Sequence, residues 1–156
     1  MKKQFYLWAC CLLAALLGFS SCSDDDEGAS VGSREMLIGE WEAVSYYSED
    51  WENGELVGED TEDYAGGNGY FRLNFHEDGM CDWIEGYTSS GSEYTDRVDW
   101  TYSGNQLAYD WGDGELEIWT VTLLTATELE YEVRYSETDE GIRFETYEKY
   151  VFKKKQ

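Results

Sequence analysis

Between Gly39 and Lys153, apolar and polar residues alternate along short runs, and this alternation restricts the fold more than any other feature. A period of two places every second side chain on one face, as in a half-buried β-strand. Glycine, asparagine and aspartate separate the runs, and the chain contains no proline. The pattern predicts an all-β protein. The expected strands are Glu40–Tyr47, Tyr70–His76, Met80–Tyr87, Arg97–Ser103, Gln106–Trp111, Glu115–Leu124, Glu128–Ser136 and Ile142–Lys153.

The joints between these runs are short and have the composition of tight turns. Such turns join neighbouring antiparallel strands as hairpins. Eight strands joined mainly by hairpins indicate an up-and-down meander, and its closure into a barrel removes the exposed edges. The turns are expected at Asp78-Gly79, Gly104-Asn105, Gly112-Asp113-Gly114, Ala126-Thr127 and Asp139-Glu140-Gly141.

The longest connection runs from Ser48 to Asn68 and is rich in acidic residues. A connection of this length in a compact domain is usually functional or mobile, so one hypothesis is a lid over a barrel mouth. The alternative is an additional hairpin that turns at Asn53-Gly54. In that case Glu55–Gly58 forms a ninth strand.

The alternation also assigns side chains to faces. In the run from Glu128, the residues Leu129, Tyr131, Val133 and Tyr135 are expected to point inward. In the last run, Thr146 and Glu148 share the face of the apolar Phe144, Tyr150 and Phe152. A carboxylate on a core-facing position must be paired or hydrated. The phase breaks between Ile118 and Trp119, which predicts a β-bulge there.

The N-terminus has the three parts of a secretory signal. Lys2 and Lys3 form a basic start, an apolar stretch follows from Phe5 to Phe19, and small residues precede Cys22. The apolar stretch is shorter than the roughly 20 residues that cross a bilayer as a helix. Residues 1–21 are therefore expected to be a signal peptide, and residues 35–156 a single domain.

Phe19-Ser20-Ser21-Cys22 resembles the lipobox of bacterial lipoproteins. The resemblance implies cleavage before Cys22, acylation of that cysteine and anchoring in the outer membrane. Phe19 departs from the aliphatic residue that is usual in the box. Several acyl chains on one cysteine satisfy the need for more than one anchor in stable membrane attachment.

Residues 22–34 are expected to form an acidic tether that reaches about 40 Å when extended. Its acidic run resembles the surface-export signal that follows the lipidated cysteine in gut-type Gram-negative bacteria. That resemblance implies a protein facing the cell exterior, whereas the alternative is a solvated spacer. The residues of the run are Ser23, Asp24, Asp25, Asp26 and Glu27.

Net charge excludes some partners. The formal charge is −23, and it becomes −25 once Lys2 and Lys3 are removed with the signal. Nucleic acid is not an expected partner, because its phosphates require basic side chains. Acidity of this degree can accompany disorder, but an aromatic content of 17% supplies apolar surface for a core.

The number and positions of the cysteines exclude a disulfide within the mature chain. Cys10 and Cys11 lie in the signal and Cys22 carries lipid, so Cys81 remains alone and no disulfide can form within one mature chain. His76 is the single histidine. Cys81 is expected to be a buried small hydrophobe and not a nucleophile.

Gly39-Glu40-Trp41 opens the first run and resembles the Gly-x-Trp start of lipocalins. In that family the tryptophan plugs the closed end of the barrel, which implies this place for Trp41. The order of later segments is similar to the lipocalin-like domains of bacterial lipoproteins, from Phe75-His76-Glu77-Asp78-Gly79 to the final Tyr150-Val151-Phe152-Lys153. The resemblance implies an eight- or nine-stranded barrel with an interior cavity, and it does not name a ligand.

Aromatic side chains on the expected inner face invite a carbohydrate hypothesis, because sugar rings stack on aromatic rings. The alternative is that they fill the core, since strands favour aromatic residues. The candidate cavity residues are Trp83, Trp100, Tyr102, Tyr109, Trp111, Tyr131, Phe144, Thr146 and Glu148.

Enzymatic and metal chemistry have little support in the sequence. The acidic segments Asp110–Glu115 and Glu59–Asp63 offer oxygen ligands for calcium but lack EF-hand spacing. No Ser-His-Asp set or phosphate-binding glycine loop is present. We therefore expect no enzyme, no cofactor and no metal, with a glycan hydrolase as a minor alternative.

Two functional hypotheses follow. The first is a lipid-anchored, lipocalin-like protein that binds a small apolar or glycan-type ligand, or a partner, at the cell surface. The second is an accessory or structural envelope protein that acts through its outer surface and holds no internal ligand.

Overall fold

The computed structural model describes residues 31–156, most of which lie in antiparallel strands. Within this range, no helix is long and apolar enough to cross a membrane. The elements in chain order are α1 (Arg34–Leu37), β1 (Gly39–Glu52), β2 (Glu55–Asp63), β3 (Gly69–Phe75), β4 (Met80–Tyr87), β5 (Ser92–Ser103), β6 (Gln106–Asp110), β7 (Leu116–Leu124), β8 (Glu128–Asp139) and β9 (Ile142–Lys154).

Eight of the strands close into a barrel. The hydrogen-bonded order runs β1-β3-β4-β5-β6-β7-β8-β9, and β9 returns to β1. All of these pairings are antiparallel. β2 is a ninth strand that pairs only with β1. The predicted all-β meander barrel of eight or nine strands is therefore confirmed.

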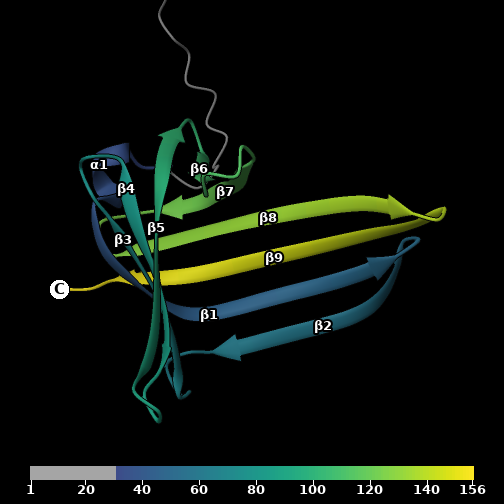
Figure 1. The fold of residues 1–156 in the computed structure, drawn as a ribbon, viewed down its shortest axis with the longest axis horizontal. Coiled ribbons are helices and arrows are strands. Elements are labelled where there is room, and N and C mark those ends of the chain that lie inside the picture. Colours follow the sequence, from purple (N-terminus) through teal and green to yellow (C-terminus); the bar gives the residue numbers. More distant parts are fainter. Residues whose placement is uncertain (1–30) are drawn as a thin grey trace, which may run out of the picture.

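β1 belongs to two parts of the molecule. Its first residues, Gly39–Glu42, pair with β3, whereas Ser45–Glu52 pair with β2. Its other edge pairs with β9 along almost its full length. Residues 45–63 and 133–149 therefore continue beyond the barrel as a four-stranded sheet, which we call the arm. Figure 1 shows the arm projecting to one side, while the β4–β5 hairpin projects in another direction.

The segment after Ser48 is part of this arm, so the hypothesis of a lid is wrong. β1 extends to Glu52, the chain turns at Asn53-Gly54, and β2 runs to Asp63. Asn53 and Gly54 have φ values of 50° and 82°, as the expected two-residue hairpin requires. β2 is exposed along almost its full length. It therefore lacks the apolar alternation by which longer strands are recognised.

The expected bulge between Ile118 and Trp119 is also wrong in position. The register of β7 against β8 shifts between Val121 and Leu123 instead. Ile118 points outward and is 45% exposed, so Trp119 and Val121 keep a regular alternation. An exposed isoleucine had suggested a phase break where none exists.

The core fills the barrel end next to α1. Trp41 is completely buried, and its Nε1 donates a 2.7 Å hydrogen bond to the Leu37 carbonyl. Lys154 lies over its ring and donates to the Met36 carbonyl. The helix is thereby fastened across this end of the barrel. The aromatic members of the core are Trp41, Phe71, Phe75, Trp100, Tyr109, Trp119, Tyr131 and Phe152.

Candidate functional site

The nine candidate cavity residues separate into three groups. The first group is core: Trp100, Tyr109 and Tyr131 are at most 3% exposed. Tyr109 lies between Phe75 and Trp83, with ring centroids 6.3 and 5.7 Å away. These rings fill the interior next to α1. This agrees with the alternative to the carbohydrate hypothesis, in which the aromatic residues form the core.

Tyr102 packs against this core and completes the first group, and it lies with Trp100 at the α1 end. Arg34 lies over the Trp100 ring at 4.4 Å, and the Trp100 Nε1 donates to the Met80 carbonyl. Tyr102 lies two residues further along β5, toward the turn to β6. Trp100 is the cross-strand neighbour of Tyr109, so these candidates share the packed interior and line no open cavity.

The second group, Trp83 and Trp111, lies away from α1. Their ring centroids are 5.3 Å apart, and Trp83 also packs 4.5 Å from Phe71. Trp111 is 37% exposed. The two indoles therefore form the rim where the barrel interior opens to solvent.

The third group lies on the arm, on the face that continues the barrel interior. Phe144, Thr146 and Glu148 alternate along β9 in register with Tyr150. Thr146 donates a 2.8 Å hydrogen bond to Asp50, and Tyr46 donates one of 3.3 Å to Glu148. The expectation that Thr146 and Glu148 share a face with the apolar residues of β9 agrees with this register.

One residue at the opening was absent from the candidates. The Glu117 carboxylate accepts hydrogen bonds from Trp111 at 2.8 Å, Trp119 at 2.7 Å and Tyr135 at 3.2 Å. Alternation alone would have identified Glu117, because it lies two residues before the buried Trp119 and therefore on the same face of β7. The bulge that was expected between Ile118 and Trp119 placed the two residues on different faces.

These contacts define a compact group at the open end, which we call the mouth cluster: Tyr46, Trp111, Glu117, Tyr135 and Glu148. Members come from β1, β7, β8 and β9 and from the segment after β6. Tyr46 opposes Tyr150 across β1 and β9, with ring centroids 4.7 Å apart. The cluster lies at the junction between the barrel and the arm, far along the strands from α1.

Burial and neighbouring negative charges raise the pKa values of several groups in the mouth cluster. Burial raises the pKa of Glu148, and the charges of Glu117 and Asp50 add to this effect. Burial also raises the pKa of Tyr46 and Tyr135, with Glu148 contributing to both. The carboxylates of the cluster receive their hydrogen bonds from phenols and indoles.

Basic side chains of residues 31–156 lie elsewhere. Arg72 pairs with Glu42 on the outer face of the barrel, and Lys149 pairs with Glu130 at 2.7 Å. Arg134 lies over the Tyr147 ring, on the face opposite Tyr135. The negative charge of the mouth cluster is therefore not neutralised by an ion pair within this part of the chain.

A pocket of about 250 Å³ adjoins the cluster, between the start of β3, the end of β4 and the arm. Tyr64, Phe71 and Tyr150 supply its aromatic wall, and Glu62 and Glu85 supply carboxylates. Trp83 donates a 2.8 Å hydrogen bond to Glu85. The combination of aromatic rings and uncompensated carboxylates thus extends from the mouth cluster into this hollow.

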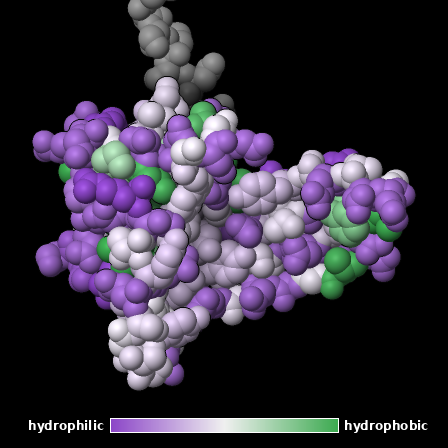
Figure 2. Space-filling model, viewed as in Figure 1, coloured by the Kyte–Doolittle hydropathy of each residue, from purple (hydrophilic) through white to green (hydrophobic). Residues whose placement is uncertain are grey.

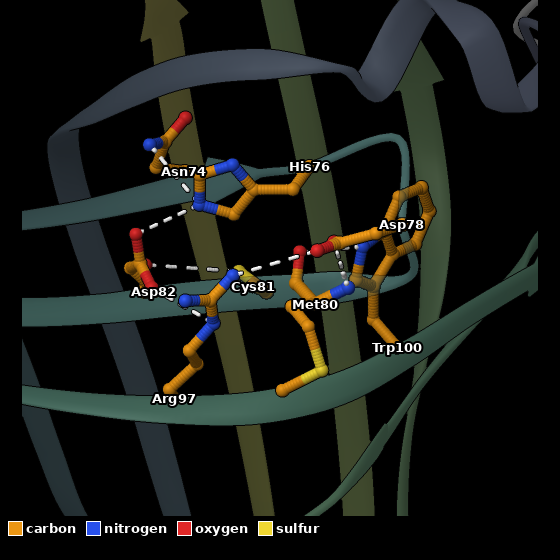
Figure 3. Close-up of polar contacts among 8 residues, drawn as sticks. All are labelled: Asn74, His76, Asp78, Met80, Cys81, Asp82, Arg97 and Trp100. Carbon is orange, nitrogen blue, oxygen red and sulfur yellow. Dashed lines mark hydrogen bonds and ion pairs between the residues drawn. The ribbon is translucent and has the colours of Figure 1, made fainter.

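A separate polar group surrounds the single histidine on the outer face of β3, β4 and β5 (Figure 3). His76 Nε2 lies 2.8 Å from Asp82 Oδ2, and Arg97 lies 3.7 Å from the other oxygen of Asp82. Cys81 is buried and its Sγ contacts the Asp82 carbonyl. Burial raises the pKa of Cys81 well above its usual value. The thiol is therefore a protonated core group and not the partner of the imidazole.

The acidic segments proposed for calcium have structural roles in the described residues. Asp110 Oδ1 accepts from the Gly112 amide at 2.8 Å, and Asp113 Oδ1 accepts from the Glu115 amide at 3.0 Å. The acids of Glu59–Asp63 lie along β2. Between residues 31 and 156, no three or more histidine, cysteine or acidic side chains are grouped so that they could hold a metal ion. Cys22 and the acidic run Ser23–Glu27 lie outside the described residues.

Glu148→Gln is expected to stabilise the fold at neutral pH by on the order of 0.5 kcal/mol, because it removes one of several like charges on neighbouring strands. The folded-state pKa of Glu148 is raised, so its ionisation opposes folding as pH rises. Below the usual carboxyl range, near pH 3, the wild-type residue is protonated in both the folded and the unfolded state, and the difference should vanish. Thermal melts at the two pH values measure this, and a variant less stable than wild type at neutral pH would contradict it.

No protein-family model matches the chain, and no curated protein matches it in sequence.

Proposed function

We propose that this protein is a lipid-anchored binding protein of the outer membrane that holds a glycan-type ligand at the mouth of its barrel. The observation that carries the proposal is the mouth cluster, where Glu117 and Glu148 lie among aromatic rings on an open inner face. Aromatic faces suit the apolar faces of sugar rings. Carboxylates accept hydrogen bonds from their hydroxyl groups.

The packing of the barrel supports a ligand at the mouth over an apolar ligand enclosed along the axis. Trp119 lies 4.6 Å from Tyr131, and Tyr131 lies 5.2 Å from Phe152. All three side chains are at most 2% exposed. The space nearest α1 is therefore occupied by the protein's own rings, while Trp111 and Tyr135 remain 37% and 42% exposed.

The proposed lipid attachment and cell-surface location rest on the N-terminal sequence. Acylation of Cys22 anchors the chain in the outer membrane, and the acidic run Ser23–Glu27 directs it to the cell exterior. A binding site at the mouth suits a surface protein that meets extracellular glycans. Labelling of intact cells with a membrane-impermeant reagent tests the location, and protection of the protein in such cells would contradict it.

A ligand screen tests the binding function. The mature chain, with Cys22 replaced by serine to remove the lipid, is applied to a glycan array and titrated by native mass spectrometry with the best candidates. We expect saturable binding that the double variant Trp111→Ala/Tyr135→Ala weakens at least about tenfold, which equals about 1.4 kcal/mol. Absence of any saturable glycan binding, or equal binding by the double variant, would contradict the proposal.

The tip of the arm favours a second candidate, an envelope protein that docks through its outer surface. Leu56 and Val57 are 43% and 60% exposed on β2, and Phe144 is 36% exposed at the same end of the arm on β9. Figure 2 shows apolar surface gathered at this end of the arm. Exposed apolar clusters often mark protein contacts. Cross-linking in membranes tests this candidate. The wild-type protein should form a specific cross-linked adduct, and the double variant Leu56→Asp/Val57→Asp should not.

A further inference from the structure

We propose that the ligand of the mouth cluster carries an ammonium group, so that the site recognises an amine-bearing molecule such as an amino sugar or a polyamine. This inference rests on the proposed function, because it assigns a chemical class to the ligand of the same site. It follows from the charges, the rings and the unpaired acceptors that the cluster brings together.

Two carboxylates face this opening with neutral hydrogen-bond donors only. Glu117 receives an indole N–H from Trp111 and another from Trp119, together with the Tyr135 hydroxyl. Glu148 receives the Tyr46 hydroxyl. Each of these donors orients a carboxylate without cancelling its charge. An ammonium group would add the charge-assisted hydrogen bonds that are absent.

The outer face of the same barrel shows the contrast. There, Glu130 pairs with Lys149 at 2.7 Å, and Glu40 pairs with Lys155 at 2.7 Å. Asp82 pairs with both His76 and Arg97. Within residues 31–156, the ion pairs therefore lie on the outer face, and no cation of the chain pairs with Glu117 or Glu148.

Aromatic rings around the carboxylates favour a cation over a neutral ligand. Tyr46 and Tyr150 have ring centroids 4.7 Å apart beside Glu148. Trp83 and Trp111 have centroids 5.3 Å apart beside Glu117. Cations bind over the faces of such rings with about 0.5–2 kcal/mol, depending on desolvation.

A second and independent observation is the pair of unpartnered hydroxyls behind Glu117. Tyr109 and Tyr131 are completely buried, and neither hydroxyl has a hydrogen-bond partner. Burial raises the pKa of both phenols, and the neighbouring Cys81 and Glu117 add to this effect, so each phenol keeps its proton. Buried polar atoms without partners are rare in folded proteins. Tyr109 is the cross-strand neighbour of Glu117, so one of these unsatisfied polar groups belongs to a residue directly beside the carboxylate.

The test compares amine and neutral probes on the mature chain with serine at position 22. Isothermal titration calorimetry at neutral pH uses spermine, tetraglucosamine and fully N-acetylated tetraglucosamine. We expect spermine, tetraglucosamine or both to bind at least about tenfold more tightly than the acetylated sugar. Binding of tetraglucosamine alone identifies an amino sugar, and binding of spermine alone identifies an aliphatic polyamine.

Matched variants locate the site. Glu117→Gln and Glu148→Gln each remove one mouth carboxylate, whereas Glu49→Gln removes a carboxylate from the opposite face of the arm. Glu49 also accepts from aromatic donors, Tyr47 at 2.7 Å and Trp51 at 3.2 Å. The mouth variants should weaken amine binding about tenfold or more, and Glu49→Gln less than about twofold. Circular dichroism melts verify that each variant is folded.

Three results would overturn the inference, and they separate it from the proposed function. If the acetylated sugar binds as tightly as the amine, the mouth recognises a neutral glycan and only the inference fails. If none of the probes binds, and the glycan array is also negative, both fail. If Glu49→Gln weakens amine binding as much as Glu148→Gln, the amine responds to overall charge and not to the mouth.

Discussion

Replacement of Trp41 by alanine is expected to lower the free energy of unfolding by about 3–5 kcal/mol, the usual range for truncation of a buried aromatic side chain. Trp41 is completely buried between α1 and the barrel strands. Its loss removes apolar contacts, a hydrogen bond to the Leu37 carbonyl and the ring beneath Lys154. Urea denaturation followed by far-UV circular dichroism measures the change.

Trp41→Phe is the matched variant. It keeps most of the apolar contact and loses the indole N–H, so the Leu37 carbonyl must find another donor. We expect a loss of about 1–2 kcal/mol, smaller than that of the alanine variant. A Trp41→Ala protein within about 1 kcal/mol of wild type would show that α1 does not depend on this residue.

Glu117→Ala is expected to destabilise the fold by about 1–3 kcal/mol, which is the penalty for leaving a buried donor without an acceptor. The Trp119 side chain is only 2% exposed, and its Nε1 donates to Glu117. Trp111 and Tyr135 are more exposed and can bind water once the carboxylate is removed. Chemical denaturation and near-UV circular dichroism, which reports on the packing of Trp119, measure the effect.

Glu49→Ala supplies the comparison, because Glu49 accepts the same kinds of donor but neither of its donors is fully buried. Tyr47 and Trp51 lie on the outer face of the arm, where water can replace the carboxylate. Its removal should change stability by less than about 0.5 kcal/mol, as is usual for surface positions. Equal losses for the two alanine variants would mean that burial of the indole donor does not govern the effect.

Much of the fold could be predicted because the turns and the alternation agree with each other. The runs from Met80 and from Glu128 were placed within a few residues of β4 and β8. β2 was only partly foreseen, since its Glu55–Asp63 sequence buries no residue and shows no inner face. What identified it was the Asn53-Gly54 turn, a local signal that does not depend on burial.

The candidate site was less predictable, and the reason is geometrical. Alternation correctly placed Trp100, Tyr109 and Glu148 on one face. It could not show that β8 and β9 leave the barrel beyond Val133, so that the same face is core at Tyr131 and exposed at Tyr135. Membership of a face follows from local sequence, whereas depth within the barrel depends on which strands are still paired around it.

The position of α1 has a consequence for the orientation of the whole protein. The chain enters the barrel beside Trp41, and the mouth cluster lies at the other end of the strands. If Cys22 carries the proposed lipid anchor, its tether of about 40 Å at most would hold the helix end toward the lipid. The carboxylates of Glu117 and Glu148 would then look outward. In this orientation the α1 end of the barrel faces the membrane, and the mouth cluster is accessible to ligands from the medium.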